Sequence, residues 1–104
     1  MRPQSVTVSS QAASAALPVD YAVNPFNIGI GCVATGTLTY KVQFTFDNVM
    51  DSTVTATWFD SADLTGETTS QYGALTIPVR AVRLNVTAYT NGSVTMTLIQ
   101  GRGN

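Results

Sequence analysis

The stretch that decides the fold is VRLNVTAYTNGSVTMTLIQGRGN, residues 82–104. Apolar and polar residues alternate on both sides of its central Asn-Gly, as in two half-buried β-strands joined by a turn. A three-residue loop at 90–92 keeps the apolar residues of both strands on one face, whereas a two-residue turn would mix the faces. The sequence therefore predicts a hairpin of strands at 81–89 and 93–100, with Gly92 in the left-handed conformation. The predicted cross-strand pairs are Ala88 with Val94, Val86 with Met96, and Leu84 with Leu98.

A second hairpin is predicted by the same pattern in CVATGTLTY, residues 32–40. A three-residue loop at 34–36 again matches the apolar faces, because it pairs Cys32 with Leu38. The hairpin leads into the longest alternating run, TLTYKVQFTF at 37–46. The residues of that run expected to face inward are Leu38, Tyr40, Val42, Phe44 and Phe46, and those expected to face outward are Thr39, Lys41, Gln43 and Thr45. Further strands are predicted at 5–9, 28–33, 53–59 and, as a short piece, within ALPVDYAV at 16–23.

The composition also indicates an all-β chain. Sixteen threonines and twelve valines favour the pleated, half-buried surface of a sheet, and no window holds a helical repeat over three turns. A length of 104 residues corresponds to one domain. We therefore expect a single antiparallel β-sandwich or jelly roll spanning residues 1–104. Residues 1–11 are expected to form either an N-terminal arm laid on a neighbouring molecule or an edge strand of the domain itself.

The predicted core is built from side chains of these strands. Five aromatic residues are expected to supply most of its bulk: Tyr40, Phe44, Phe46, Trp58 and Phe59. Cys32, the only cysteine, lies in an apolar run and is expected to pack there as a buried thiol. The polar segment FDSADLTGETTSQYG, residues 59–73, is expected to be a surface loop.

Several classes of function are excluded by missing residue types. The chain has no histidine, so a Ser-His-Asp or Cys-His catalytic group cannot form, and one cysteine cannot form an internal disulfide. Five basic and six acidic residues give a net charge of −1, which argues against a nucleic-acid partner. No apolar run approaches the ~20 residues of a membrane helix. We expect a protein that is not an enzyme and has no catalytic, cofactor-binding or metal-binding residues.

The acidic residues of the segment 59–73 leave one alternative open. The three acids of this segment are Asp60, Asp63 and Glu67. Loop oxygens of this kind can hold a calcium ion, but the spacing matches no EF-hand loop, so solvated acids are the simpler interpretation. Asp47 and Asp51, on either side of Asn48, are expected to form a turn.

The outward faces of the predicted strands carry hydroxyl and methyl groups and few charges. Charged residues make up 11% of the chain and Lys41 is the only lysine, although natural sheets usually protect their edges with charges or prolines. The threonines predicted to face outward are Thr37, Thr39, Thr45, Thr53, Thr55, Thr57, Thr95 and Thr97. We therefore expect the edges and faces to be covered by neighbouring subunits in an assembly.

Most of the chain, from about Val6 to Gly101, resembles small virion proteins of tailed bacteriophages. The segments that carry the resemblance are LPVDYAVNPFNIGIG (17–31), YKVQFTFDNV (40–49), ATWFD (56–60) and IPVRAVRLNVTAYTNGSVTMTLIQG (77–101). The shared pattern is a proline-bounded start, a long strand leading into W-F-D, and a closing R-L-N-V-T strand pair that ends in I-Q-G. It contains no catalytic signature.

The resemblance implies a capsid decoration, or cement, protein. Such β-sandwich proteins sit on the outer shell as dimers or trimers, where they bridge and stabilise major capsid subunits. The implied partners are the major capsid protein and copies of this chain, with no nucleic acid and no membrane. The implied location is the capsid surface of the virion, after synthesis in the host cytoplasm.

Two alternatives remain open at this point. The chain could be a tail, fibre or adaptor component of the same virion. It could also be a carbohydrate-binding module, because jelly rolls often carry sugars. The aromatic residues available for such a site outside the predicted core are Tyr21, Tyr72 and Tyr89.

Overall fold

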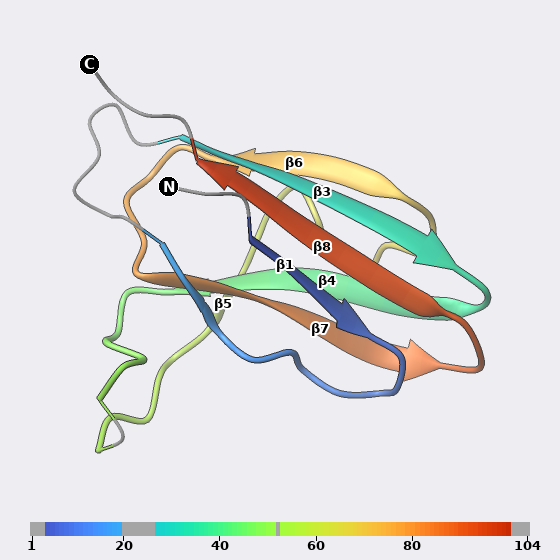
Figure 1. Ribbon diagram of the computed structural model, residues 1–104, viewed down its shortest axis with the longest axis horizontal. Coiled ribbons are helices and arrows are strands. Elements are labelled where there is room, and N and C mark those ends of the chain that lie inside the picture. Colours follow the sequence, from blue (N-terminus) through green and yellow to red (C-terminus); the bar gives the residue numbers. More distant parts are fainter. Residues whose placement is uncertain (1–3, 20–26, 52, 101–104) are drawn as a thin grey trace.

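The computed structural model describes residues 4–19, 27–51 and 53–100, which form eight strands in two antiparallel sheets packed face to face (Figure 1). Sheet A has the order β1-β8-β3-β6, with β1 at Gln4–Val8, β8 at Ser93–Gln100, β3 at Ile28–Thr35 and β6 at Gln71–Leu75. Sheet B has the order β2-β7-β4-β5, with β2 at Leu17–Pro18, β7 at Ala81–Tyr89, β4 at Leu38–Thr45 and β5 at Phe59–Asp60. The predicted all-β sandwich is confirmed. The described residues include no helix long and apolar enough to span a membrane.

The two predicted hairpins are wrong, because each pair of strands crosses from one sheet to the other. β7 pairs with β4 and β2, whereas β8 pairs with β1 and β3, so Val94 lies opposite Val8 and Ala34 rather than Ala88. β3 and β4 are likewise in different sheets. A connection that arches over the core satisfies the same alternation as a hairpin, since both strands still point their apolar residues inward. The inward residues predicted for β7 and β8 are accordingly buried, apart from the exposed Ala88.

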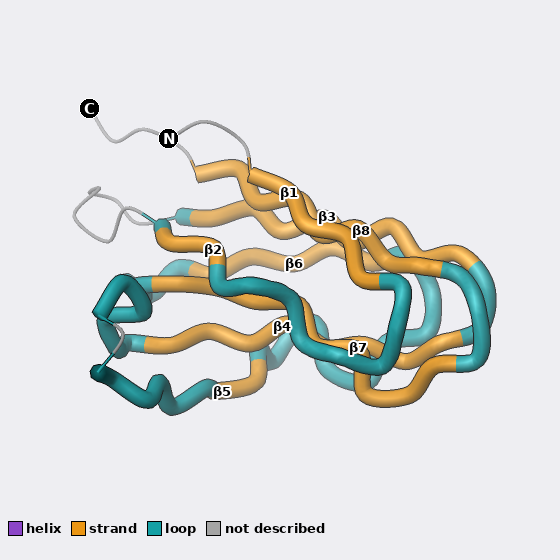
Figure 2. The backbone as a smooth tube through the Cα atoms, turned by 60° about the horizontal axis from the view of Figure 1, so that its bottom comes forward, coloured by secondary structure: helices purple, strands orange, loops and turns teal. Residues whose placement is uncertain are grey.

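The two arches lie against each other at the end of the sandwich where β3 and β7 finish (Figure 2). Gly36 and Gly92 both have positive φ, at 78° and 91°, so the predicted left-handed Gly92 is confirmed, in an arch rather than a hairpin bulge. The Thr37 backbone N–H donates to the side-chain and backbone oxygens of Asn91, at 3.0 and 3.1 Å. A Cβ on Gly92 would lie 1.9 Å from the Thr35 carbonyl oxygen. Only glycines allow the two loops to approach this closely.

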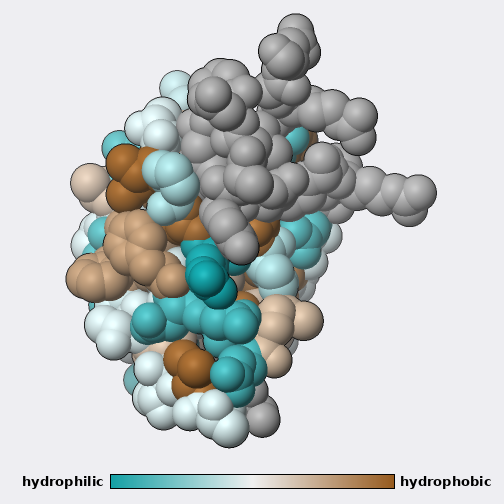
Figure 3. Space-filling view, turned by 90° about the vertical axis from the view of Figure 1, so that its left-hand side faces the viewer, coloured by the Kyte–Doolittle hydropathy of each residue, from teal (hydrophilic) through white to brown (hydrophobic). Residues whose placement is uncertain are grey.

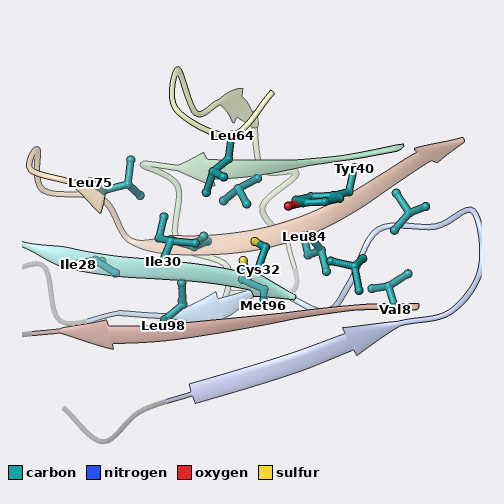
Figure 4. Packing of buried hydrophobic residues seen from close by; sticks show 14 of the residues in the cluster. Val8, Ile28, Ile30, Cys32, Tyr40, Leu64, Leu75, Leu84, Met96 and Leu98 are labelled. Carbon is teal, nitrogen blue, oxygen red and sulfur yellow. The ribbon is translucent and has the colours of Figure 1, made fainter. Parts of the chain in front are cut away.

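The core between the sheets is mainly aliphatic (Figure 4). Tyr40 is fully buried and its hydroxyl donates to the Thr69 carbonyl oxygen at 2.6 Å. The other four predicted core aromatics are not fully buried: Phe44 and Trp58 are half-buried, while Phe46 and Phe59 are 49% and 47% exposed. Phe46 lies just beyond the last residue of β4, where the sheet no longer covers it. The predicted aromatic core is therefore confirmed for Tyr40 and in part for Phe44, which packs against the core, and is wrong for Phe46, Trp58 and Phe59.

Of the strand predicted at 53–59, only Phe59 is in a strand, as the first residue of β5. The preceding residues form turns, in which the Asn48 side chain accepts from the Met50 N–H at 3.1 Å and Asp51 accepts from the Thr53 N–H at 2.9 Å. The predicted turn around Asn48 is thus confirmed. The strand predicted within ALPVDYAV is present only as β2, and its residues 20–23 lie outside the described part.

The edge strands of sheet B, β2 and β5, have only two residues each, and irregular backbone segments continue both edges beside β7 and β4. Along β7, the Ser14 N–H donates to Leu84 O at 2.7 Å, and the Val86 N–H to Ala12 O at 3.0 Å. Along β4, the segment 61–67 continues the pairing begun by β5, with the Val42 N–H donating to Leu64 O at 2.9 Å. The segment 59–73, predicted as a surface loop, is largely exposed, but it also contains β5, the start of β6 and a stretch that pairs with β4 and buries Ser61 and Leu64.

Sheet A ends in β1 and β6, so residues 4–8 form an edge strand of the domain itself.

Candidate interaction surfaces

Three phenylalanine rings form a cluster at the end of sheet B where β4 finishes. Phe59 lies opposite Phe44 in the β4–β5 pairing, and Phe46 follows β4. The ring centroids are 5.9 Å apart for Phe44–Phe59, 5.7 Å for Phe44–Phe46 and 5.7 Å for Phe46–Phe59. Figure 3, which looks at this end of the molecule, shows apolar side chains gathered on one side of it. We call these three residues the aromatic cluster.

A hollow of about 360 Å³ continues the aromatic cluster between β5 and β6. Phe44, Leu75 and Ile77 supply apolar lining, and Ile77 is 49% exposed. Asp60 and Asp63 line the same hollow. Half-exposed aromatic rings beside a partly apolar hollow are typical of protein-contact surfaces, because a partner that covers such rings removes a large apolar area from water.

The outer face of sheet B carries a connected polar network centred on Gln43. The Gln43 side chain donates to Asp60 at 3.0 Å and accepts from Arg83 at 2.9 Å and Asn85 at 3.2 Å. Lys41 completes it with an ion pair to Asp60 at 3.2 Å. The hydrogen bonds from Gln43 and Lys41 lower the pKa of the Asp60 carboxyl. Gln43 was predicted to face outward, and it does so beneath these neighbours.

Trp58 belongs to this polar face and not to the core. The Arg83 guanidinium lies 4.3 Å from the centroid of the Trp58 ring, a cation–π arrangement. Partial burial lowers the pKa of Arg83, which nevertheless stays charged at any physiological pH. The predicted role of Trp58 as a core anchor is therefore wrong, and the residue packs on the outside of sheet B.

The outer face of sheet A, in contrast, bears no charged side chain within the described residues. The residues that point outward along its strands are Ser5, Thr7, Gly29, Gly31, Val33, Tyr72, Ala74, Thr95, Thr97 and Ile99. Thr7 and Thr95 share a hydroxyl–hydroxyl hydrogen bond of 2.9 Å. Thr95 and Thr97 are thus outward, as predicted. Among the other predicted threonines, Thr45 is fully buried and residues 53–57 lie on a loop.

The structure does not bring the acids of the segment 59–73 together as an ion site. Asp60 belongs to the Gln43 network, Asp63 accepts a hydrogen bond from the Ala74 N–H at 3.3 Å, and the Glu67 backbone pairs with Tyr40. Across the described ranges, no three His, Cys, Asp or Glu residues are placed to hold a metal ion. Calcium binding by these acids therefore has no support from the geometry.

The tyrosines considered for sugar binding differ in exposure. Tyr72, on β6, is 85% exposed and lines a shallow hollow with Asp63 and Gln71. Tyr89 is half-buried and its hydroxyl donates to the Gly92 carbonyl oxygen at 2.9 Å. Tyr21 lies outside the described residues.

Cys32 is buried beside Tyr40, as the sequence predicted. Burial raises the pKa of the Cys32 thiol from 9.0 to about 12, and a hydrogen bond with Tyr40 opposes this only partly. Burial also raises the pKa of Tyr40, with smaller contributions from Cys32 and Glu67. The folded state thus favours the neutral forms of both groups.

We expect Cys32 to be unreactive toward the thiol reagent DTNB at pH 8 in the folded protein and to react fully in 6 M guanidinium chloride. Because its folded-state pKa exceeds the unfolded value, the folded protein should keep its stability below pH 9 and lose stability as the pH rises from 9 toward 12. Urea unfolding at pH 7, 9 and 10.5 measures this. Equal stability at all three values, or a fast native DTNB reaction, would contradict the buried thiol.

Comparisons with known proteins do not assign this chain to a family. No protein-family model matches it, and no curated protein matches it. Among solved structures, it is similar to a chain reported as "Bacillus endospore appendages form a novel family of disulfide-linked pili". The identity is 19%, the match covers 99% of this chain and 88% of the other, and the TM-score is 0.40. A likeness at this level carries no information on function.

Proposed function

We propose that this chain is a non-enzymatic structural protein that acts by binding other protein subunits. The observation that carries the proposal is the aromatic cluster, whose rings at Phe46 and Phe59 are half-exposed beside a partly apolar hollow. Covering apolar area contributes roughly 25 cal/mol per Å², and aromatic residues in such positions dominate many interfaces. A partner subunit is what this surface fits best.

Within that class, we propose a bacteriophage capsid decoration protein that bridges and stabilises major capsid subunits on the virion surface. Support for this narrower role comes from the resemblance of residues 17–31, 40–49, 56–60 and 77–101 to small virion proteins. The partners would be the major capsid protein and further copies of the chain. Repeated weak contacts with a regular lattice add up to firm attachment, so no single contact has to be large.

The test is the copy number of the chain in purified particles of the virus that encodes it, measured by quantitative mass spectrometry. Hundreds of copies per particle are expected for a shell-covering protein. A few dozen or fewer would instead favour the tail, fibre or adaptor role, and none would overturn the virion assignment.

The aromatic cluster is tested by the double substitution F46S/F59S. We expect it to lower the number of copies per particle by about tenfold or more, because it removes the exposed rings that a partner would cover. V33S/I99S is the matched control, since it removes two apolar side chains of 62% and 56% exposure from the outer face of sheet A. Equal losses for both variants would show that the aromatic cluster has no special role.

A second candidate function, carbohydrate binding, is favoured by Tyr72 alone. Its ring is exposed, with the Asp63 carboxylate and the Gln71 amide in the same hollow of about 500 Å³, and sugars commonly stack on such rings while polar groups bind their hydroxyls. Binding on a glycan array that is abolished by Y72A and retained by Y89A would support this function. An array without any bound glycan would remove it.

A further inference from the structure

Three of the four edges of the two described sheets are poor templates for another strand. Each edge of sheet B consists of a two-residue strand, β2 or β5, continued by an irregular segment, at 12–14 beside β7 and at 61–67 beside β4. At β6, the carboxylate of Asp63 accepts the Ala74 N–H at 3.3 Å, which places a charge on that edge. Charges and covering loops are the usual means by which sheets avoid pairing with other chains.

The fourth edge, along Ser5 to Val8 of β1, lacks such protection within the described residues. β1 pairs with β8 on one side, and no described backbone group pairs with these residues on the other. Its sequence, Gln-Ser-Val-Thr-Val, contains no charge and no proline. An uncharged edge of this kind is a template for adding another strand, because the outward N–H and C=O groups along Ser5 to Val8 have no partner among the described residues.

We propose that two copies of this chain pair through their β1 strands in antiparallel fashion, with Val6 opposite Val6 of the second copy. Centring on Val6 keeps the pairing within the five residues of β1, with Ser5 opposite Thr7 on either side of the central Val6 pair. The two copies would then share one continuous eight-stranded sheet made from both sheets A. The pairing is isologous, so it closes as a dimer and does not extend into a filament.

The strand is compatible with itself on both faces in this register. Val6 and Val8 point toward the core, so each copy continues the apolar inner face of the other. Ser5 of one copy lies opposite Thr7 of the second copy on the outer face, because residues directly opposite in an antiparallel pair share a face. These hydroxyls can bond as Thr7 and Thr95 already do at 2.9 Å. Absence of charge on the strand means that two identical copies meet without repulsion.

The proposed β1 dimer rests on the proposed function in one respect: in each proposal, the chain is a subunit of a larger assembly. It supplies a specific form for the contact with further copies and leaves the aromatic cluster free for a different partner. A chain that is monomeric in solution yet present in hundreds of copies per particle would overturn the dimer and leave the proposed function standing. A stable dimer absent from particles would do the reverse.

The test is the solution mass of the recombinant full-length chain by sedimentation equilibrium, together with charge substitutions on β1. We expect the wild type to be dimeric at micromolar concentrations. S5K/T7K should weaken the dimer by about tenfold to hundredfold, because each dimer then has two lysine pairs directly opposite. The control variant T95K/T97K adds two lysines on β8, one strand away from the edge, and also breaks the Thr7–Thr95 hydrogen bond. This control should remain dimeric.

The register itself is tested by S5K/T7E. In the proposed pairing, each lysine faces a glutamate of the second copy, so this variant should recover an affinity within about threefold of the wild type. A monomeric wild type, a dimer unaffected by S5K/T7K, or failure of S5K/T7E to restore the dimer would each overturn the proposal. Far-UV circular dichroism confirms that every variant is folded.

Discussion

Replacement of Gly92 by alanine should destabilise the protein by about 3–5 kcal/mol, through left-handed strain and steric overlap together. The residue has φ of 91°, and a Cβ there would lie 1.9 Å from Thr35 O and 2.7 Å from the Gly36 Cα. Both atoms belong to the backbone of the other arch, so no side chain can move aside. Domains of this size are commonly stable by about 5–15 kcal/mol, and the variant should therefore be close to unfolding. Urea unfolding followed by the fluorescence of Trp58 measures the change.

Gly66→Ala is the matched control for this substitution. Gly66 also has positive φ, at 67°, but a Cβ there meets no atom within 4 Å. The Gly66→Ala substitution should lower the free energy of unfolding only by the strain of the left-handed conformation, about 1–2 kcal/mol. If the two alanine variants unfold at the same urea concentration, the contact between the arches contributes nothing to stability.

Leu64→Ala should destabilise the protein by about 2–5 kcal/mol, the range for removing a fully buried leucine side chain. Leu64 is 0% exposed although it lies in the polar segment 59–73, and it points from that segment into the core. Its carbonyl also accepts the Val42 N–H at 2.9 Å. The cavity left by alanine would weaken the cover over the β4 edge as well as the core. Thermal unfolding measured by circular dichroism gives the loss.

Ile77→Ala serves as the control, since Ile77 has a side chain of equal size that is 49% exposed. It should cost less than about 1 kcal/mol. Similar losses for the two substitutions would mean that the segment 59–73 is not anchored by Leu64. A large loss confined to L64A would establish this polar stretch as part of the folded domain.

The sequence was informative about strands because alternation reports which side chains point inward. Val86 and Met96 are buried as predicted, yet they belong to opposite sheets. A hairpin and an arch demand the same inward pattern, so periodicity cannot choose between them. The contact that distinguishes the arches from hairpins is between Gly36 and Gly92, which are 56 positions apart. A local sequence pattern cannot predict a contact over this distance in the sequence.

The candidate surfaces were harder to predict for a related reason. Hydrophobicity places an aromatic residue in a core by default, but Phe46 and Phe59 lie at the end of sheet B, where there is little sheet to cover them. Trp58 is drawn to the outer face by Arg83, its partner from β7. The exposure of Tyr72, by contrast, was predictable because it lies in a polar stretch. The turn-rich sequence between Phe46 and Trp58 argues against a regular strand there. This feature could have predicted that the aromatic residues on either side of it lie at the end of the sheet.

The strand order has a consequence for how the chain is made. β8 lies between β1 and β3 in sheet A, and β7 lies between β2 and β4 in sheet B, so the last two strands of the domain to be synthesised occupy inner positions of both sheets. Neither sheet can close until residues 81–100 have left the ribosome. Until then β1 and β2 have no strand partner, although β3 can already pair with β6 and β4 with β5. The pairing of β1 with β8 joins the two ends of the described chain, and such non-local pairing belongs to the slow class of folding reactions. Folding of this domain therefore cannot be completed while its C-terminal strands are still inside the ribosome.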